Sequence, residues 1–328
     1  MKHYVGIENH NKHELKSLID SAMTLKRRMF SDVLKNKTFI SMFFNPSTRT
    51  KTSFDLAMNQ LGGHCITIEP GKSSWGIEIG EGAVMDGDAE EHLKEAVKVL
   101  CRYGDAIGVR CFPQFKDWSI EKEDLILKNM LKWSDVPIIN METITHPCQA
   151  LAMMLTIYEK LKQPEKKKFV LSWAYHPKPL NTAVANSAGQ MAAKFGMDLV
   201  IANPPGYDLP DEYLSYMKED CRKNGSNFVI ENDMESAFQG ADFVYAKSWG
   251  SLAQYGKFDK AEHDKHKHWI VDSKRMALTN NAWFSHCLPV RRNMIVSDAV
   301  IDSDRSLVYD EAENRLHVQK AILMELLK

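Results

Sequence analysis

The sequence predicts an α/β protein of two doubly wound domains, each built on a parallel sheet and joined by helices. Two observations predict this fold class. The chain has 328 residues, about two domains of ~150 residues each. Along it, short apolar runs alternate with longer amphipathic segments, as strands and helices do in a parallel sheet. With 44% hydrophobic and 26% charged residues, each half can bury a core of its own.

In the first half, strands and helices are expected in turn. Leu15, Leu18, Ile19 and Met23 share one face and predict the opening helix. The apolar run TFISMFF predicts the first buried strand. The expected helices are 12–30, 50–60, about 88–103 and 119–132, and the expected strands are 38–44, 64–68, 106–112 and 136–141.

The second half repeats this alternation, starting from a long helix at 147–161 that is placed to link the domains. Further helices are expected at 181–195, 210–223 and 311–327, with a short one after 231, and strands at 168–174, 198–202, 228–231, 242–247 and 283–287. In open α/β sheets, ligands bind at the carboxyl ends of the strands. Residues that directly follow strands are therefore the candidates for a functional site.

The composition excludes several classes of protein. The net charge is -1, from 42 basic and 43 acidic residues. The chain therefore lacks the excess of basic residues that is typical of a nucleic-acid-binding protein. No apolar stretch reaches the ~20 residues of a membrane helix, and the first residues lack the apolar core of a signal peptide. The six cysteines include no C-x-x-C pair, as is typical of free thiols in a reducing compartment. We therefore expect a cytoplasmic protein without nucleic-acid or membrane partners.

A cluster of hydroxyl and cationic side chains follows the first strand. Ser47, Thr48, Arg49 and Thr50 lie at the turn into the next helix, whose first N–H groups attract anions. An ordinary helix cap would also place Ser and Thr here. Arg49 favours a phosphate site, because a guanidinium binds phosphate with paired hydrogen bonds. The glycine-rich pattern of a nucleotide P-loop is absent.

Two further segments place polar groups after strands. Arg110 ends an apolar strand, where it needs either a buried carboxylate or a ligand anion as partner, and both alternatives stay open. The segment METITHPCQA holds Glu142, His146 and Gln149 between a strand and a helix. Pro147 fits the first helical position, so His146 lies near the helix start and can donate to a carbonyl oxygen. A structural histidine is the alternative.

Three other features are weaker candidates. Cys287 and Leu288 follow a strand, but His286 points to the opposite face of that strand, so we do not expect Cys287 to be a nucleophile. The charged segment with His263, His266 and His268 has metal-like spacing but reads as a solvated face. Gly62-Gly63 before a strand predicts a turn rather than a dinucleotide site.

Taken together, these motifs resemble the carbamoyltransferase (transcarbamylase) family. The shared motifs are S-T-R-T at 47–50, H-P-C-Q at 146–149 and H-C-L-P at 286–289, in family order along the whole chain. The resemblance implies a carbamoyl-phosphate-binding domain at 1–145 and a domain for an acylated ornithine at 146–328. It also implies that a final helix, about 311–327, returns to the first domain. The family resemblance further implies a homotrimer with active sites at subunit interfaces, and no metal or cofactor.

Within the family, the chain is most similar to the branch that acts on N-acetyl-L-ornithine in arginine biosynthesis. The segments KSSWGIEIGEGAVMDGD, WAYHPKPLNTAVANS and DEAENRLHVQKA carry this similarity. A sibling branch acts on N-succinyl-L-ornithine and has proline where acetyl enzymes have glutamate after M-D-G-D. This chain has Glu90 there. A carboxylate at that position would repel the second carboxylate of a succinyl group and tolerate a neutral acetyl group.

The resemblance also assigns roles to individual residues. Those implied for carbamoyl phosphate are Ser47, Thr48, Arg49, Thr50, Trp75 from a neighbouring subunit, Arg110, His146, Gln149, Cys287, Leu288 and Arg315. Those implied for the acylated ornithine are Glu142, Lys247 and Asn181, with Glu90 setting the choice of acyl group. The implied reaction carbamoylates the δ-amine and yields N-acetyl-L-citrulline and phosphate.

Two positions depart from the family pattern. Lys51 stands where S-T-R-T is commonly followed by arginine. Ile295 stands where some acetylornithine enzymes have a lysine, and this segment is more similar to the succinyl branch. A succinylornithine enzyme is therefore the closest alternative, and a noncatalytic phosphate- or metabolite-binding protein is a remote one. A dehydrogenase would share the doubly wound domains but needs the G-x-G-x-x-G motif, which is missing.

Overall fold

The computed structural model describes residues 2–27 and 30–328, and the chain forms two compact units. Unit 1 is Met1–Cys148 together with Arg315–Lys328, and unit 2 is Gln149–Asn314. The last segment of the chain therefore belongs to the same unit as its beginning. Along the sequence, the two boundaries between the units fall within helices α6 (Pro147–Leu161) and α13 (Val308–Leu327).

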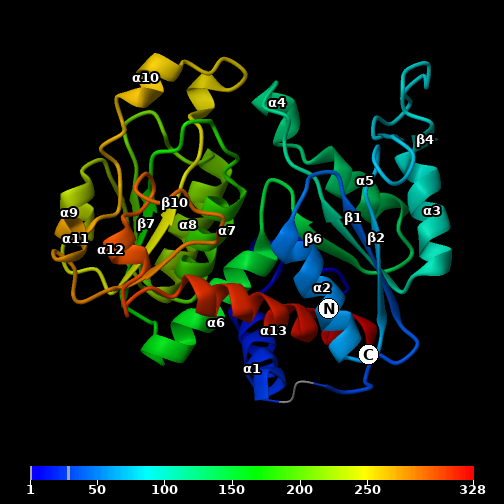
Figure 1. Ribbon diagram of the computed structural model, residues 1–328, viewed down its shortest axis with the longest axis horizontal. Coiled ribbons are helices and arrows are strands. Elements are labelled where there is room, and N and C mark those ends of the chain that lie inside the picture. Colours follow the sequence, from blue (N-terminus) through cyan, green and yellow to red (C-terminus); the bar gives the residue numbers. More distant parts are fainter. Residues whose placement is uncertain (1, 28–29) are drawn as a thin grey trace. The chain divides into compact units, whose positions relative to one another are not determined.

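Unit 1 is built on a parallel sheet of order β2-β1-β5-β6 (Figure 1). Its strands are β1 (Thr38–Phe43), β2 (His64–Ile68), β5 (Ala106–Arg110) and β6 (Ile138–Glu142). The other elements of this unit are η1 (Ile7–Asn9), α1 (Lys12–Arg27), α2 (Thr48–Gln60), β3 (Ile77–Glu78), β4 (Glu91–His92), α3 (Leu93–Tyr103), α4 (Trp118–Glu121) and α5 (Leu125–Trp133).

The core of unit 1 explains why its central strands are continuous apolar runs. Parallel sheets are covered on both faces, so strand residues that point either way are buried. Ile40 and Met42 of β1 pack in one cluster with Ile107 and Val109 of β5 and with Val97 of α3. Because all four strands run in the same direction, their carboxyl ends lie along one edge, where the predicted site residues follow.

Two predicted helices of unit 1 differ in the structure. The helix expected at 119–132 is two helices, α4 and α5, separated at Asp124, whose backbone has φ 47. The helix expected from about 88 begins only at Leu93, because Glu91–His92 pair instead with Ile77–Glu78 as short strands. Arg27 ends α1, and positions 28–29 of the predicted helix lie outside the described residues.

Unit 2 is built on a second parallel sheet, of order β11-β10-β7-β8-β9. The predicted strands 198–202 and 228–231 and the helix 147–161 match the structure at both ends. The elements of this unit are β7 (Lys168–Trp173), α7 (Ala183–Lys194), β8 (Asp198–Ala202), α8 (Asp211–Asn224), β9 (Phe228–Glu231), α9 (Met234–Phe238), β10 (Phe243–Lys247), η2 (Leu252–Gln254), α10 (Lys260–Asp264), α11 (Ser273–Met276), β11 (Trp283–Ser285) and α12 (Asp298–Ile301).

Helix α7 is buried on every face, which its sequence permits because it is rich in alanine and contains a glycine. Gly189 lies where an added Cβ would be 2.8 Å from the Met217 side chain of α8. Small residues here allow α7 to pack closely on both α8 and the sheet. No helix in the described part of the chain is both long and apolar enough to cross a membrane.

Candidate active site

The start of helix α2 carries the residues from which the sequence predicts an anion site, here called the α2 cradle (residues 47–50). The Ser47 hydroxyl caps the helix by accepting the Thr50 N–H at 3.1 Å. Arg49 is half-buried, and in the described chain its Nε atom has no hydrogen-bond partner. A buried guanidinium N–H without a partner is costly unless a ligand accepts it. Next to it, Lys51 forms an ion pair with Glu69 at 3.3 Å. The helix start thus combines a dipole end, hydroxyls and a cation, as a phosphate requires.

The C-terminal helix reaches this cradle within unit 1. The Nη2 atom of Arg315 donates to the Thr50 hydroxyl at 2.6 Å, and both side chains are buried. This contact places a second guanidinium beside the first turn of α2. The sequence could not show this proximity from spacing, because the two residues are 265 positions apart.

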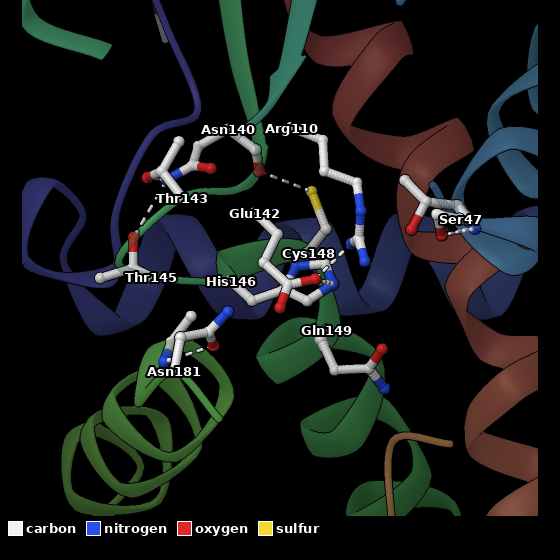
Figure 2. A network of polar contacts seen from close by, with 12 residues as sticks. Ser47, Arg110, Asn140, Glu142, Thr143, Thr145, His146, Cys148, Gln149 and Asn181 are labelled. Carbon is white, nitrogen blue, oxygen red and sulfur yellow. Dashed lines mark hydrogen bonds and ion pairs between the residues drawn. The ribbon is translucent and has the colours of Figure 1, made fainter. Parts of the chain in front are cut away.

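The ends of β5 and β6 bring three charged or ionisable side chains together (Figure 2). Arg110 and Glu142 are paired in the register of the two strands, and Arg110 Nη1 donates to Glu142 Oε2. His146 Nε2 lies 3.4 Å from the same carboxylate oxygen. All three side chains are buried, with exposed fractions of 9%, 7% and 2%. Breaking a buried ion pair by removing one partner costs about 3–5 kcal/mol.

The sequence left open whether Arg110 pairs with a buried carboxylate or with a ligand anion, and the structure shows a buried carboxylate, that of Glu142. The ion pair does not use all the N–H donors of Arg110, since its Nε atom has no partner among the residues described. The guanidinium also packs over the Phe112 ring, 4.4 Å from its centroid, which fixes its plane. Arg110 can thus be held by Glu142 and still bind an anion through the remaining N–H.

The segment between β2 and α3 carries Trp75 and Glu90. The short β3–β4 pairing brings its two ends together, since a Cβ added at Gly76 would lie 3.6 Å from the Ala89 Cα atom. Trp75 is 62% exposed, unusual for the largest apolar side chain, and Glu90 is also exposed. Neither residue contacts the α2 cradle through an interaction that the structure shows.

Two of the residues predicted for the acylated ornithine, Lys247 and Asn181, lie in unit 2. Lys247 ends β10, and its carbonyl accepts the Ala174 N–H at 3.1 Å. Asn181 lies before α7, where its Oδ1 atom accepts the Ala183 N–H at 3.2 Å. The Gly250 N–H donates to the Leu180 carbonyl at 2.9 Å, which ties the loop after β10 to the loop with Asn181.

Sequence reasoning missed Glu311, which is fully buried in unit 2. Its carboxylate accepts hydrogen bonds from Gln149 at 2.5 Å, from the Tyr245 hydroxyl at 2.9 Å and from Ser285. Glu311 therefore holds the side chain of Gln149, whose other amide atom, Oε1, has no partner in the described structure. Glu311 is one of several charged residues near the start of the last helix, so its sequence did not distinguish it.

Cys287 and Leu288 follow β11, which ends at Ser285, two residues earlier than predicted. Both Cys287 and His286 are buried. His286 Nδ1 accepts the Leu288 N–H at 2.8 Å, so this ring nitrogen orders the loop. The Leu288-Pro289 peptide bond is cis.

The prediction that the segment at 263–268 is a solvated face is wrong for His263, which is only 2% exposed. Its Nε2 atom donates to the His176 carbonyl and its Nδ1 accepts the Tyr207 hydroxyl, both at 2.7 Å. Burial of the apolar ring edges against Trp173 and Tyr207 explains the difference. Across residues 2–27 and 30–328, no group of three His, Cys, Asp or Glu residues could hold a metal ion.

The fold and the α2 cradle define an α/β protein with a candidate anion site at the carboxyl edge of its first sheet. Comparison with known families extends this description. Residues 2–159 match the carbamoyl-P binding domain of aspartate/ornithine carbamoyltransferase, and residues 178–326 match its Asp/Orn binding domain. The chain belongs to the aspartate/ornithine carbamoyltransferase family.

Curated relatives separate into branches of this family. An N-acetylornithine carbamoyltransferase of Xanthomonas campestris is 50% identical, over 99% of this chain and 98% of that protein. An N-succinylornithine carbamoyltransferase of Bacteroides thetaiotaomicron is 38% identical over 96% of each chain. An ornithine carbamoyltransferase of Caldicellulosiruptor saccharolyticus is 32% identical over 99% of this chain and 98% of that protein. Similarity to the acetylornithine branch is therefore greater.

Solved structures of acetylornithine transcarbamylases also match this chain over its full length. A crystal structure of acetylornithine transcarbamylase complexed with acetylcitrulline matches with a TM-score of 0.99 at 50% identity, covering 100% of both chains. A variant of N-acetyl-L-ornithine transcarbamylase complexed with carbamyl phosphate and N-succinyl-L-norvaline matches with a TM-score of 0.98 at 50% identity, covering 99% of this chain and 100% of that one. The α/β fold with its C-terminal helix is thus that of the family.

Proposed function

We propose that this protein transfers the carbamoyl group of carbamoyl phosphate to the δ-amine of N-acetyl-L-ornithine, giving N-acetyl-L-citrulline and phosphate. The observation that carries the proposal is the α2 cradle, where Ser47, Thr50 and the unpartnered Arg49 Nε surround a helix N-terminus. The relatives at 50% identity that act on N-acetylornithine support the choice of acceptor.

Carbamoyl phosphate would lie at the carboxyl edge of the unit 1 sheet. Its phosphate would bind the N–H groups and hydroxyls at the start of α2 and the Arg49 guanidinium. Arg110 and His146 lie on neighbouring strand ends and would bind the carbamoyl oxygen. The remaining residues proposed for this substrate are Thr48, Trp75, Gln149, Cys287, Leu288 and Arg315.

The reaction begins when the neutral δ-amine attacks the carbamoyl carbon and a tetrahedral oxyanion forms. Thr50, Arg110 and His146 would stabilise this negative charge, as preorganised donors do in oxyanion holes. Phosphate then leaves, held by Arg49, and its oxygens take the proton of the amine. Holding two substrates in reacting geometry is worth up to ~7–11 kcal/mol of the barrier. No step needs a metal or redox cofactor.

The acylated ornithine would bind Lys247, Glu142 and Asn181. The ammonium of Lys247 suits the α-carboxylate, and Asn181 lies on a loop tied to the same region of unit 2. We assign to Glu90 the rejection of longer, charged acyl groups. Solved variants of the relative, with a glutamate replaced by proline or serine, hold N-succinyl-L-norvaline, which supports a glutamate in this role.

N-succinyl-L-ornithine is the second candidate acceptor, favoured by the segment around Ile295. This residue is buried at 2% exposure and its N–H donates to the Arg291 carbonyl. An apolar side chain there cannot provide the charged group that a lysine would.

We further propose a cytoplasmic homotrimer acting in arginine biosynthesis, with domains that divide the two substrates between 1–145 and 146–328. Three large apolar side chains, Trp75, Val84 and Met85, are exposed on one short segment, which supports subunit assembly because grouped exposed apolar residues typically mark an interface. In this assembly Trp75 would complete the site of the neighbouring subunit.

The function is tested by incubating the purified protein with carbamoyl phosphate and, in turn, ornithine, N-acetylornithine, N-succinylornithine and aspartate. Phosphate release and the carbamoylated product are both measured. We expect N-acetylcitrulline with the highest kcat/KM. A preference for N-succinylornithine would overturn the role of Glu90. Phosphate release no faster than in the absence of protein, with every amine tested, would favour a noncatalytic binding protein.

A further inference from the structure

Asp124 connects helix α5 to the loop that follows β6. It precedes the first residue of α5 in a left-handed conformation with φ 47, which aspartate tolerates better than most residues. Its Oδ2 atom accepts the Thr143 hydroxyl at 2.5 Å. Burial raises the pKa of the Asp124 carboxyl to about 6, although Thr143 and the N–H groups of Leu127 and Ile144 favour its ionised form. The carboxylate is thus held in place at an electrostatic cost.

The bond from Asp124 continues into a buried network around Thr143. The Asn140 amide donates to the hydroxyls of Thr143 and Thr145, both at 3.0 Å, and Figure 2 shows these side chains clustered beside the loop. The Thr143 N–H donates to the Thr145 carbonyl at 3.0 Å. The loop is therefore fixed at two positions between Glu142 and His146. Asn140 has no exposed surface, so water cannot readily replace these bonds.

This loop carries two groups of the candidate active site. Thr143 directly follows Glu142, whose carboxylate contacts both Arg110 and His146. A shift of the loop would therefore move the ion pair and the imidazole together. A displacement of about 1 Å in a positioning group can reduce a rate about 100-fold.

We propose that Asp124 is a positioning residue for carbamoyl transfer, acting through Thr143 to fix Glu142 and His146. This inference rests on the proposed function. The Asp124 carboxylate acts only indirectly, since it accepts hydrogen bonds from the Thr143 hydroxyl and from neighbouring backbone N–H groups. Its removal should lower kcat while the protein remains folded.

The test compares Thr143→Val, which keeps the shape but loses the hydroxyl, with Thr143→Ser, which keeps the hydroxyl. Asp124→Asn removes the charge at the other end of the bond. Asp117→Asn is the matched control, because Asp117 caps α4 through Ser119 and has no bond to the loop. The readouts are kcat and both KM values for carbamoyl transfer, with thermal unfolding to verify folding.

We expect kcat to fall about 10- to 100-fold in Thr143→Val and in Asp124→Asn, and to stay within about threefold in Thr143→Ser and Asp117→Asn. The variant that combines Thr143→Val with Asp124→Asn should be no slower than the slower of the two single variants, because both remove the same bond. Equal kcat values in Thr143→Val and Thr143→Ser would overturn the inference. This comparison holds even when Asp124→Asn does not fold. An inactive wild type would instead overturn the proposed function. Crystal structures of the Thr143 variants then decide, because a retained Arg110–Glu142 contact in Thr143→Val would exclude the positioning role.

Discussion

Arg315 donates a hydrogen bond to the hydroxyl of Thr50 at 2.6 Å, although the two residues are 265 positions apart in the chain. The contact joins the last helix to the first turn of α2, where the phosphate is proposed to bind. The hydrogen bond holds the buried Arg315 guanidinium beside the α2 cradle. The cradle is therefore assembled from both ends of the same unit.

Replacing Arg315 by lysine should weaken carbamoyl phosphate binding. Lysine keeps the charge but loses the planar fork, and a hydrogen bond to a charged group contributes about 1.5–3 kcal/mol. We expect the KM for carbamoyl phosphate to rise about 10- to 100-fold, with the KM for the acceptor little changed. Steady-state kinetics measures this, with Arg222→Lys on the exposed face of α8 as control. An unchanged KM would show that Arg315 serves only packing.

Removal of the Asn129 amide should loosen the segment that carries Trp75 and Glu90. The side-chain amide of Asn129, on α5, donates to the Ile79 carbonyl at 3.0 Å. Ile79 lies between Trp75 and Glu90 in the sequence. Asn129→Leu keeps the volume and breaks this bond. We expect a several-fold higher KM for both substrates, because Trp75 is proposed for carbamoyl phosphate and Glu90 for the acylated ornithine. Lys128→Ala, at the exposed neighbouring position, should change neither KM, and unchanged KM values in Asn129→Leu would contradict the prediction.

Glu90 should control the choice between acyl groups through its charge. Glu90→Gln removes the charge without altering the backbone, whereas Glu90→Pro also restricts it. We expect kcat/KM for N-succinylornithine relative to N-acetylornithine to rise at least tenfold in both variants. Competition between the two acceptors measures the ratio, and Asp88→Asn, an exposed acid two residues away, is the control. A shift in the proline variant alone would assign the effect to backbone shape.

His263 should make the protein less stable in mild acid. Burial lowers the pKa of His263 below its usual 6.5, so the folded protein keeps the ring neutral. As the pH falls below 6.5, the unfolded chain takes up a proton that the folded chain does not, and stability falls until the lower folded pKa is reached. His263→Gln should therefore show a smaller loss of unfolding free energy between pH 7.5 and 5.5. Urea unfolding at both pH values checks this, and the exposed His13→Gln should behave like wild type.

The fold was predictable where local pattern and tertiary structure agree. The apolar run of β1 and the proline at the start of α6 marked those elements correctly. The break between α4 and α5 was not predictable, because Asp124 adopts its conformation through a partner 19 residues away. The short β4 replaced a helix turn for the same reason: its pairing with β3 is not local.

In the candidate site, too, the sequence predicts what depends on local pattern and misses what depends on distant partners. Residues that follow strands, such as Ser47 and Arg110, were found because strand ends are visible in sequence. Glu311 was missed because its importance lies in three partners from different elements, Gln149, Tyr245 and Ser285. The roles of all these residues toward the substrates remain predictions.

The discontinuity of unit 1 has a consequence for how the protein is made. Residues up to Cys148 leave the ribosome long before Arg315–Lys328, yet both belong to one compact unit. The Thr50 hydroxyl therefore has no Arg315 partner until 265 further residues have been synthesised, and closing so long a loop is entropically costly. During that interval the first unit lacks the helix segment that covers part of its core, which is when chaperones would be needed most.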